Sequence, residues 1–117
     1  MNILSKLFGK KPAANDQAVI VKLDGVGLPG HVYEECDLST IEDQLIDVIE
    51  EKRLGEFDGN EVGERDTTLY MYGADAEKLF SGIEAVLRGY PLCEGAEVTI
   101  RRGQPGSPER KLKIIQK

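Results

Sequence analysis

Residues 38–72 read LSTIEDQLIDVIEEKRLGEFDGNEVGERDTTLYMY, and the spacing of apolar residues changes from helical to strand-like within this stretch. The first half predicts a helix over residues 38–54, because its apolar residues recur every three or four positions and define one buried stripe. That stripe consists of Leu38, Ile41, Leu45, Val48 and Ile49. The second half alternates instead, which predicts two strands, at residues 56–62 and 67–72, joined as a hairpin.

The residues on either side of this helix and hairpin extend the same plan. An alternating run precedes them at residues 18–23, and a second helical run follows at 75–88. Strand-like runs at 97–101 and 111–115 complete the chain. The resulting order is β-α-β-β-α-β with one extra strand, which is the plan of the ferredoxin-like plait. We therefore expect an α+β fold in which two helices cover one face of an antiparallel sheet. With the last strand beside the fourth, the strands lie in the order 5-4-1-3-2.

Local signals predict where the helices begin and how they pack. Residues 39–42, Ser-Thr-Ile-Glu, have the pattern of a capping box and predict the start of the first helix. Asp75 is the expected N-cap of the second helix. Gly82 lies inside that helix, where close packing against the sheet or the other helix explains the missing side chain. Ahead of the first helix we expect a glycine-rich loop at residues 24–30 and a short extended piece at 31–35.

The composition predicts one domain without a membrane span. With 117 residues, 40% of them hydrophobic, the chain suffices for a single core over residues 17–117, preceded by a flexible N-terminal tail at 1–16. No apolar run approaches the roughly 20 residues that a membrane span needs. In the tail the basic residues follow the apolar ones, which is the reverse of a secretory signal. We therefore expect a cytoplasmic location, with Cys36 and Cys93 as free thiols.

Alternation along the central strands predicts a candidate binding surface on the sheet face that the helices leave open. Leu69 and Met71 are assigned to the covered side, which places Tyr70 and Tyr72 on the open side. Half-exposed tyrosines combine a large apolar ring with a polar end, as binding surfaces often require. Ordinary cross-strand packing is the structural alternative. The predicted surface consists of Tyr70, Tyr72, Ile20 and Lys22, with Thr99 and Arg101 beside them.

Charge is distributed unevenly and predicts a protein partner. The net charge of −6 argues against binding nucleic acid, because phosphate contacts need a basic surface. One sheet edge is expected to be acidic and the other basic, which favours docking of a charged protein or of a second copy. The acidic edge carries Glu56, Asp58 and Glu61, and the basic edge carries Arg110, Lys111 and Lys113. An immunity-type inhibitor, which covers the basic cleft of an enzyme, is one form of this hypothesis.

The alternative hypothesis is a small-ligand sensor or minor enzyme that uses the glycine loop at residues 25–30 and His31. The loop lacks the spacing of a phosphate-binding motif, and its glycines are explained by turn geometry. His31 is the only histidine, and Cys36 and Asp37 are the nearest residues that could support catalysis. A concave pocket beside this loop would favour the alternative, whereas a flat face or a dimer would favour protein binding.

The sequence of the hairpin also argues against calcium binding and against RNA binding. The oxygen-bearing residues at 58–66 suggest calcium, but Val62 and Leu69 occupy positions where a calcium-binding loop needs oxygen ligands. Charges that protect an edge strand explain these residues more simply. The third strand also lacks the basic-aromatic signature of RNA-recognition domains. We therefore expect no cofactor and no bound metal.

Two stretches carry a resemblance to other proteins. Residues 55–63, GEFDGNEVG, together with TLYMYGADA at residues 68–76 and Leu79-Phe80, resemble a group of small bacterial proteins of unassigned function. This resemblance implies a bacterial cytoplasmic origin and a ferredoxin-like fold, and it transfers no functional residue. Within the pattern, Asp58-Gly-Asn60 is expected to form a bulge or tight bend in its strand.

Overall fold

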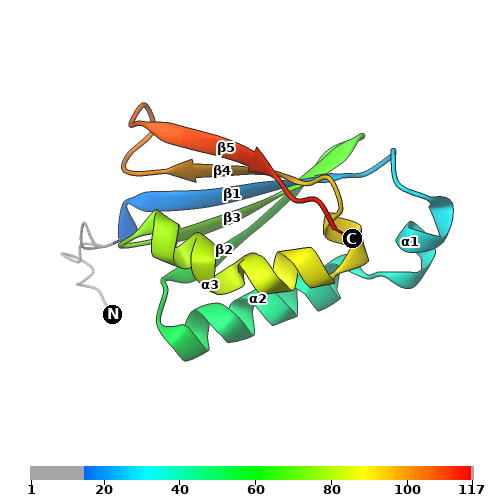
Figure 1. Cartoon of the computed structure of the whole chain (residues 1–117), viewed down its shortest axis with the longest axis horizontal. Helices are drawn as coiled ribbons and strands as arrows, with labels where there is room; N and C mark the ends of the chain where they lie inside the picture. Colours follow the sequence, from blue (N-terminus) through cyan, green and yellow to red (C-terminus); the bar gives the residue numbers. More distant parts are fainter. Residues whose placement is uncertain (1–14, 117) are drawn as a thin grey trace.

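The sheet is built from five strands, each antiparallel to its neighbours, in the order β2-β3-β1-β4-β5 (Figure 1). A computed structural model describes residues 15–116, so the expected tail at 1–16 lies outside the described residues except for its last two positions. The strands are β1 (Gln17–Asp24), β2 (Glu56–Val62), β3 (Asp66–Gly73), β4 (Glu97–Arg101) and β5 (Glu109–Lys113). The helices are α1 (Gly30–Glu35), α2 (Leu38–Lys52), α3 (Ala76–Gly89) and the short 3-10 helix η2 (Pro91–Cys93). The predicted α+β class, antiparallel sheet and strand order are confirmed.

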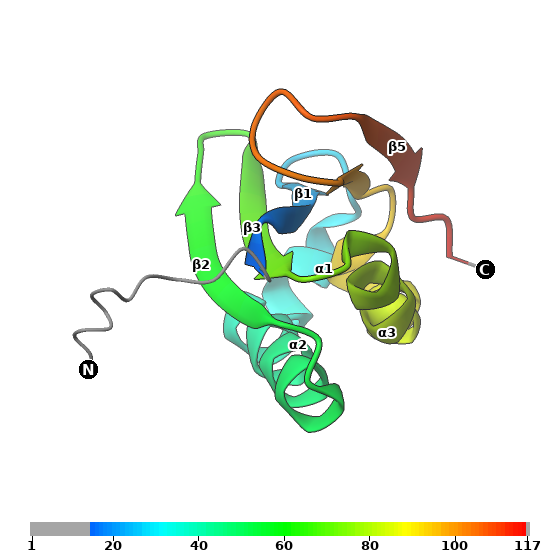
Figure 2. The ribbon, with the colours of Figure 1, turned by 90° about the vertical axis from the view of Figure 1, so that its left-hand side faces the viewer.

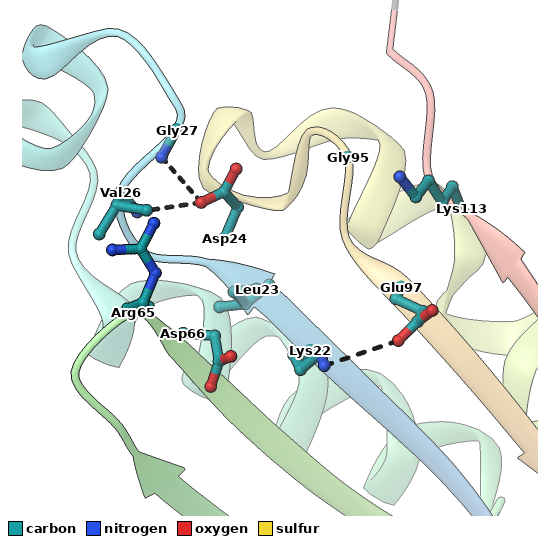
Figure 3. A pocket seen from close by; sticks show the side chains of 10 residues that line it. All are labelled: Lys22, Leu23, Asp24, Val26, Gly27, Arg65, Asp66, Gly95, Glu97 and Lys113. Carbon is teal, nitrogen blue, oxygen red and sulfur yellow. Dashed lines mark hydrogen bonds and ion pairs between the residues drawn. The ribbon is translucent and has the colours of Figure 1, made fainter.

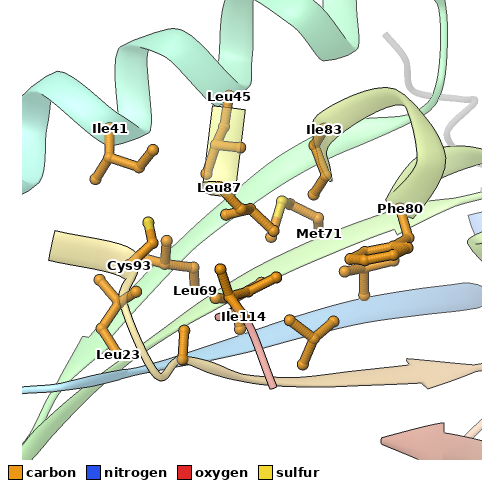
Figure 4. Packing of buried hydrophobic residues seen from close by; sticks show 14 of the residues in the cluster. Leu23, Ile41, Leu45, Leu69, Met71, Phe80, Ile83, Leu87, Cys93 and Ile114 are labelled. Carbon is orange, nitrogen blue, oxygen red and sulfur yellow. The ribbon is translucent and has the colours of Figure 1, made fainter. Parts of the chain in front are cut away.

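Helices α2 and α3 lie side by side on one face of the sheet, and the core fills the space between the two layers (Figures 1 and 2). Alternate residues of each strand point toward the helices and form the sheet's side of the core. Val19 and Val21 of β1 and Leu69 of β3 are fully buried in this way. The apolar stripes of the helices meet them through Leu45, Ile83 and Leu87 (Figure 4). Burying one such side chain contributes about 1.5–3 kcal/mol. The sequence therefore fixes which sheet face is covered.

The expected local structure at two helix starts is wrong. Residues 31–35 form most of α1 instead of an extended piece, and Pro29, with φ −56° and ψ 144°, is the N-cap of this short helix. Helix α2 begins at Leu38 with Asp37 as its N-cap, and no side chain caps it. Ser39 therefore lies inside the first turn, where it cannot act as the N-cap of a capping box. The last strand is also displaced, because β5 begins and ends two residues earlier than predicted.

Other local predictions are confirmed. Asp75 is the N-cap of α3, and its Oδ1 accepts hydrogen bonds from the backbone N–H groups of Glu77 and Lys78, each at 3.1 Å. The register between β2 and β3 shifts between Phe57 and Gly59, which is the irregularity expected at Asp58-Gly-Asn60. The missing side chain of Gly82 leaves room for Leu54, which follows α2.

Two glycines allow the turn after α2 to cross the end of β3. Gly55 has φ +144°, and a Cβ there would collide with the backbone carbonyl of Tyr72. A Cβ at Gly73 would collide in turn with the carbonyl oxygen of Leu54. The two backbones approach so closely that neither position accommodates a side chain. This crossing positions the hairpin of β2 and β3 and with it the tyrosines of β3.

We expect Gly55→Ala to destabilise the fold by on the order of 2–4 kcal/mol, because it adds both φ strain and a backbone collision. The measurement is the free energy of unfolding in urea. Gly89→Ala is the matched control, since a Cβ at that helix end meets nothing within 4 Å. That control should leave stability unchanged or raise it by up to about 1 kcal/mol. Equal stability of the two variants would contradict this account of the crossing.

Candidate binding surface

No helix or strand within residues 15–116 covers the face of the sheet opposite α2 and α3, here called the open face (Figure 2). The loop between β4 and β5 arches over part of this face, where Gln104 Nε2 donates to Asp16 Oδ1 at 3.0 Å and Ala18 is fully buried. Strand register arranges its side chains in three rows that run across all five strands. The first row is Glu56, Tyr72, Ala18, Arg101 and Glu109. The second row is Gly59, Tyr70, Ile20, Thr99 and Lys111. The third row is Glu61, Thr68, Lys22, Glu97 and Lys113.

All six residues predicted for the binding surface lie on the open face. In the second row, Ile20 pairs with Tyr70 on one side and with Thr99 on the other. Ile20 and both tyrosines are half-buried, and Thr99 is only 9% exposed. Lys22 lies in the third row, and Arg101 lies in the first row, on the far side of Ala18 from Tyr72. The centre of the open face is therefore a small apolar and aromatic area bounded by charged side chains.

The two tyrosines differ in how they are held. The Tyr70 hydroxyl donates a hydrogen bond to Oε1 of Glu61 at 2.9 Å, and this bond to a carboxylate raises the pKa of Tyr70. Its ring is thereby oriented toward β2. The Tyr72 hydroxyl makes no hydrogen bond with any residue from 15 to 116, so its polar end remains available. Tyr72 is the more suitable contact for a partner, because binding does not break an existing bond.

The basic residues expected at one edge of the sheet lie there, because β5 is the edge strand opposite β2 and carries Arg110, Lys111 and Lys113. Arg110 lies on the covered side of β5 and does not belong to the open face. Its Nε and Nη2 donate to the two carboxylate oxygens of Glu77 at 2.8 Å each, and Arg102 contacts the same carboxylate at 3.4 Å. Chiefly through the Arg110 hydrogen bonds, this pairing lowers the pKa of Glu77 to about 2. The basic side of the open face therefore consists of Lys111 and Lys113, together with Arg101.

The carboxylate of Asp24, the first residue of the glycine loop, holds the loop together through two backbone hydrogen bonds. Oδ1 of Asp24 accepts hydrogen bonds from the backbone N–H groups of Val26 at 2.9 Å and Gly27 at 2.8 Å (Figure 3). These two bonds lower the pKa of Asp24. Because Asp24 occupies these amides, they do not form the anion cradle of a phosphate-binding loop. An aspartate directly before a Gly-x-Gly turn is the sequence signal for this arrangement.

A hollow of about 550 Å³, here called the loop-end hollow, lies beside this loop at one end of the sheet (Figure 3). Three basic and three acidic side chains line this hollow. Two of them form an ion pair, with Lys22 Nζ 3.8 Å from Glu97 Oε1. The cations are Lys22, Arg65 and Lys113, and the carboxylates are Asp24, Asp66 and Glu97. Sequence reasoning missed Arg65 and Lys113 here, because only strand pairing brings the ends of β3 and β5 to one place.

The residues proposed for catalysis are not gathered around the loop-end hollow. His31 is exposed on α1 and lines neither it nor a second hollow of about 320 Å³ on the far side of the loop. Cys36 lines only the second hollow. Cys93 is buried, which raises the pKa of its thiol to about 12, and both cysteines are free as predicted. Among residues 15–116, neither hollow brings a catalytic partner to His31.

Comparisons with protein-family models, with curated proteins and with solved structures found no match to this chain. In the described part of the chain, no three or more His, Cys, Asp or Glu side chains are grouped to hold a metal ion. Across residues 15–116, no helix has both the length and the apolar content required to cross a membrane. The open face and the loop-end hollow remain as the two candidate sites.

The Glu77 pair predicts a specific pH dependence of stability. A carboxylate whose pKa is lowered on folding adds stability above its unfolded pKa, and this stability is lost as the pH falls through the folded value. The difference in unfolding free energy between wild type and Glu77→Gln should therefore shrink between pH 5 and pH 2, since the pKa of Glu77 moves from 4.5 to about 2. Urea titrations of both proteins at several pH values between 5 and 2 measure this difference in unfolding free energy.

Arg110→Gln is the matching variant, because it removes the main partner from the same pair. It should reduce the pH dependence in the same range. A difference between wild type and Glu77→Gln that stays constant from pH 5 to pH 2 would contradict the assigned pair.

Proposed function

We propose that this protein is a ferredoxin-like binding module without catalytic activity, which docks a protein partner on the open face of its sheet. The observation that carries the proposal is the composition of that face. Ile20, Tyr70 and Tyr72 form its centre, half-buried by their neighbours but not covered by any described element. Tyrosine is enriched in protein interfaces because its ring buries a large area at a small entropic loss.

The charges around this centre support docking of a protein. Carboxylates lie along β2, while β4 and β5 carry Arg101, Lys111 and Lys113 together with the carboxylates of Glu97 and Glu109. Such a rim contributes to orientation and association rate more than to affinity. It requires a partner with an apolar centre and the opposite arrangement of charge.

The perturbed groups elsewhere in the molecule fit structural roles. Asp24 closes a turn, Glu77 pairs with two arginines, and the Cys93 thiol is buried in the core. Each pKa shift is therefore explained by a local contact that stabilises the fold. These contacts do not require a catalytic function.

Photo-crosslinking from the open face tests this proposal. A photoreactive aromatic residue in place of Tyr72 should give a crosslinked protein adduct in the source cells, identified by mass spectrometry. Ile115 is the matched control position, since it is 55% exposed and lies outside the open face. An adduct that depends on position 72 is the expected result. Absence of any adduct at position 72, or equal yield at both positions, would overturn the proposal.

A small-ligand-binding function is the second candidate, and the loop-end hollow is the observation that favours it. Arg65 and Lys113 make no side-chain hydrogen bond or ion pair with any residue from 15 to 116, and they interact with Asp24 only through longer-range charge, so their N–H groups can still donate to an anionic group. The carboxylate of Asp66 could hold an amine at the same time. A small zwitterion such as a free amino acid fits this lining.

Titration of the labelled protein with free glutamate, and separately with inorganic phosphate, tests the second candidate by NMR. Saturable shifts of the Gly27 and Gly95 amides with glutamate are expected if the loop-end hollow binds a zwitterion, since both residues line it. Arg65→Gln should weaken that response. Unchanged spectra with both compounds would remove this candidate and leave protein docking.

A further inference from the structure

We propose that the second hollow, of about 320 Å³, binds a small primary amine whose body is apolar. The glycine loop, the start of α2 and the turn that joins β2 to β3 all contribute to its lining. This inference goes beyond the proposed function and does not depend on it, because none of the residues in the three rows of the open face lines this hollow.

The hollow lies where the helix layer stops covering the sheet. Thr67 pairs with Val62 on one side and with Leu23 on the other, and all three line the hollow. They belong to the helix side of their strands, as Leu69 does. Leu23 is 2% exposed, Thr67 is half-buried, and Val62 is 67% exposed. A row of the core therefore emerges into solvent toward β2 and offers an apolar contact to a ligand.

The other walls of the hollow are also mainly apolar. Leu38 is the first residue of α2, and it lines the hollow together with Cys36 and the buried Leu92 of η2. The Tyr33 side chain is held in place, because its hydroxyl donates to one backbone group of the glycine loop at 2.8 Å and accepts from another at 3.0 Å. A wall that is already ordered lowers the entropic cost of binding.

The charged side chains in the lining are all acidic. They are Asp24, Glu64 and Asp66, and no basic side chain from residues 15–116 lines this hollow. Asp24 already accepts two hydrogen bonds from loop amides. Glu64 and Asp66 make no side-chain hydrogen bond or ion pair within the described part of the chain. Their carboxylate oxygens can therefore accept hydrogen bonds from an ammonium group, and charge strengthens such bonds.

This combination of apolar walls and carboxylates defines the class of ligand. An ammonium group meets opposite charge in the second hollow, whereas a carboxylate or phosphate meets only like charge. Zwitterions and anions, which suit the mixed lining of the loop-end hollow, are therefore disfavoured here. The volume is at the lower end of the range for small-molecule sites. A monocationic amine with an aromatic or branched aliphatic body satisfies all of these conditions.

Titration of the isotopically labelled full chain with phenethylamine tests the inference by NMR. Saturable shifts of the Gly25 and Gly63 amides are expected, because both residues line the second hollow. Gly27 and Gly95 line only the loop-end hollow and should shift less. A Kd in the millimolar range is expected for a ligand of this size. Phenylpropionate, which carries a carboxylate in place of the ammonium group, should give no saturable shift.

Two variants test the two parts of the lining. Glu64→Gln should raise the Kd for phenethylamine by about two- to fivefold, as expected for the loss of one exposed ion pair. The matched control is Glu51→Gln, which removes the same charge from an exposed position of α2 that lines neither hollow and should leave the Kd unchanged. Val62→Thr keeps a β-branched side chain and should raise the Kd by up to about fourfold, because a hydroxyl replaces one methyl group.

The Cys36 thiol provides a second measurement of binding in the unmodified sequence. Cys36 lines the second hollow, whereas Cys93, the other cysteine of the chain, is fully buried. Saturating phenethylamine should slow the reaction of Cys36 with methyl methanethiosulfonate several-fold, as followed by mass spectrometry. Phenylpropionate should leave this rate unchanged.

The outcomes separate this inference from the proposed function. Absence of saturable shifts at Gly25 and Gly63 with phenethylamine would overturn it, and so would an equal response to phenylpropionate. Shifts of these amides that grow with protein concentration alone would assign the hollow to a second copy of the chain and would also overturn it. The crosslink from position 72 reports on the opposite side of the sheet, so its result stands whichever of these outcomes is found.

Discussion

β1 is hydrogen-bonded on both sides, to β3 along its whole length and to β4 along its second to sixth residues, and every other part of the structure is positioned by this central strand. Its alternating residues separate two environments. Val19 and Val21 are fully buried under the helices, whereas Ile20 and Lys22 point to the open face. A shift of one residue in either pairing would exchange these sets and place valines in water. The burial of one face therefore determines the composition of the other.

The same alternation gives β5 two separate roles. Arg110 lies on the covered side and closes the sheet against the start of α3 through Glu77, while Lys111 and Lys113 point to the open face. A short strand thus stabilises the fold with one set of residues and supplies charge to the proposed interface with the other. This division explains why a strand rich in charge is compatible with a stable sheet edge.

The two candidate sites share part of their surface. Lys22, Glu97 and Lys113 form part of the third row of the open face and also line the loop-end hollow. A molecule in the hollow would therefore contact the rim of the docking surface. The internal carboxylate of Asp24 satisfies the loop amides, and the Tyr33 hydroxyl donates to the Asp24 carbonyl oxygen at 2.8 Å. These contacts hold the loop beside the hollow.

The sequence alone determined the order of the five strands and the two long helices, the covered face of the sheet, the cap at Asp75 and the irregularity near Gly59, because each depends on spacing between neighbouring residues. It also placed Tyr70 and Tyr72 on one face of their strand. Tertiary structure decided the rest. The pairing of Arg110 with Glu77 joins residues 33 positions apart in the sequence, and the loop-end hollow exists only where the ends of several strands meet. Local periodicity carries no information about such partners, since they are selected by strand pairing and chain packing.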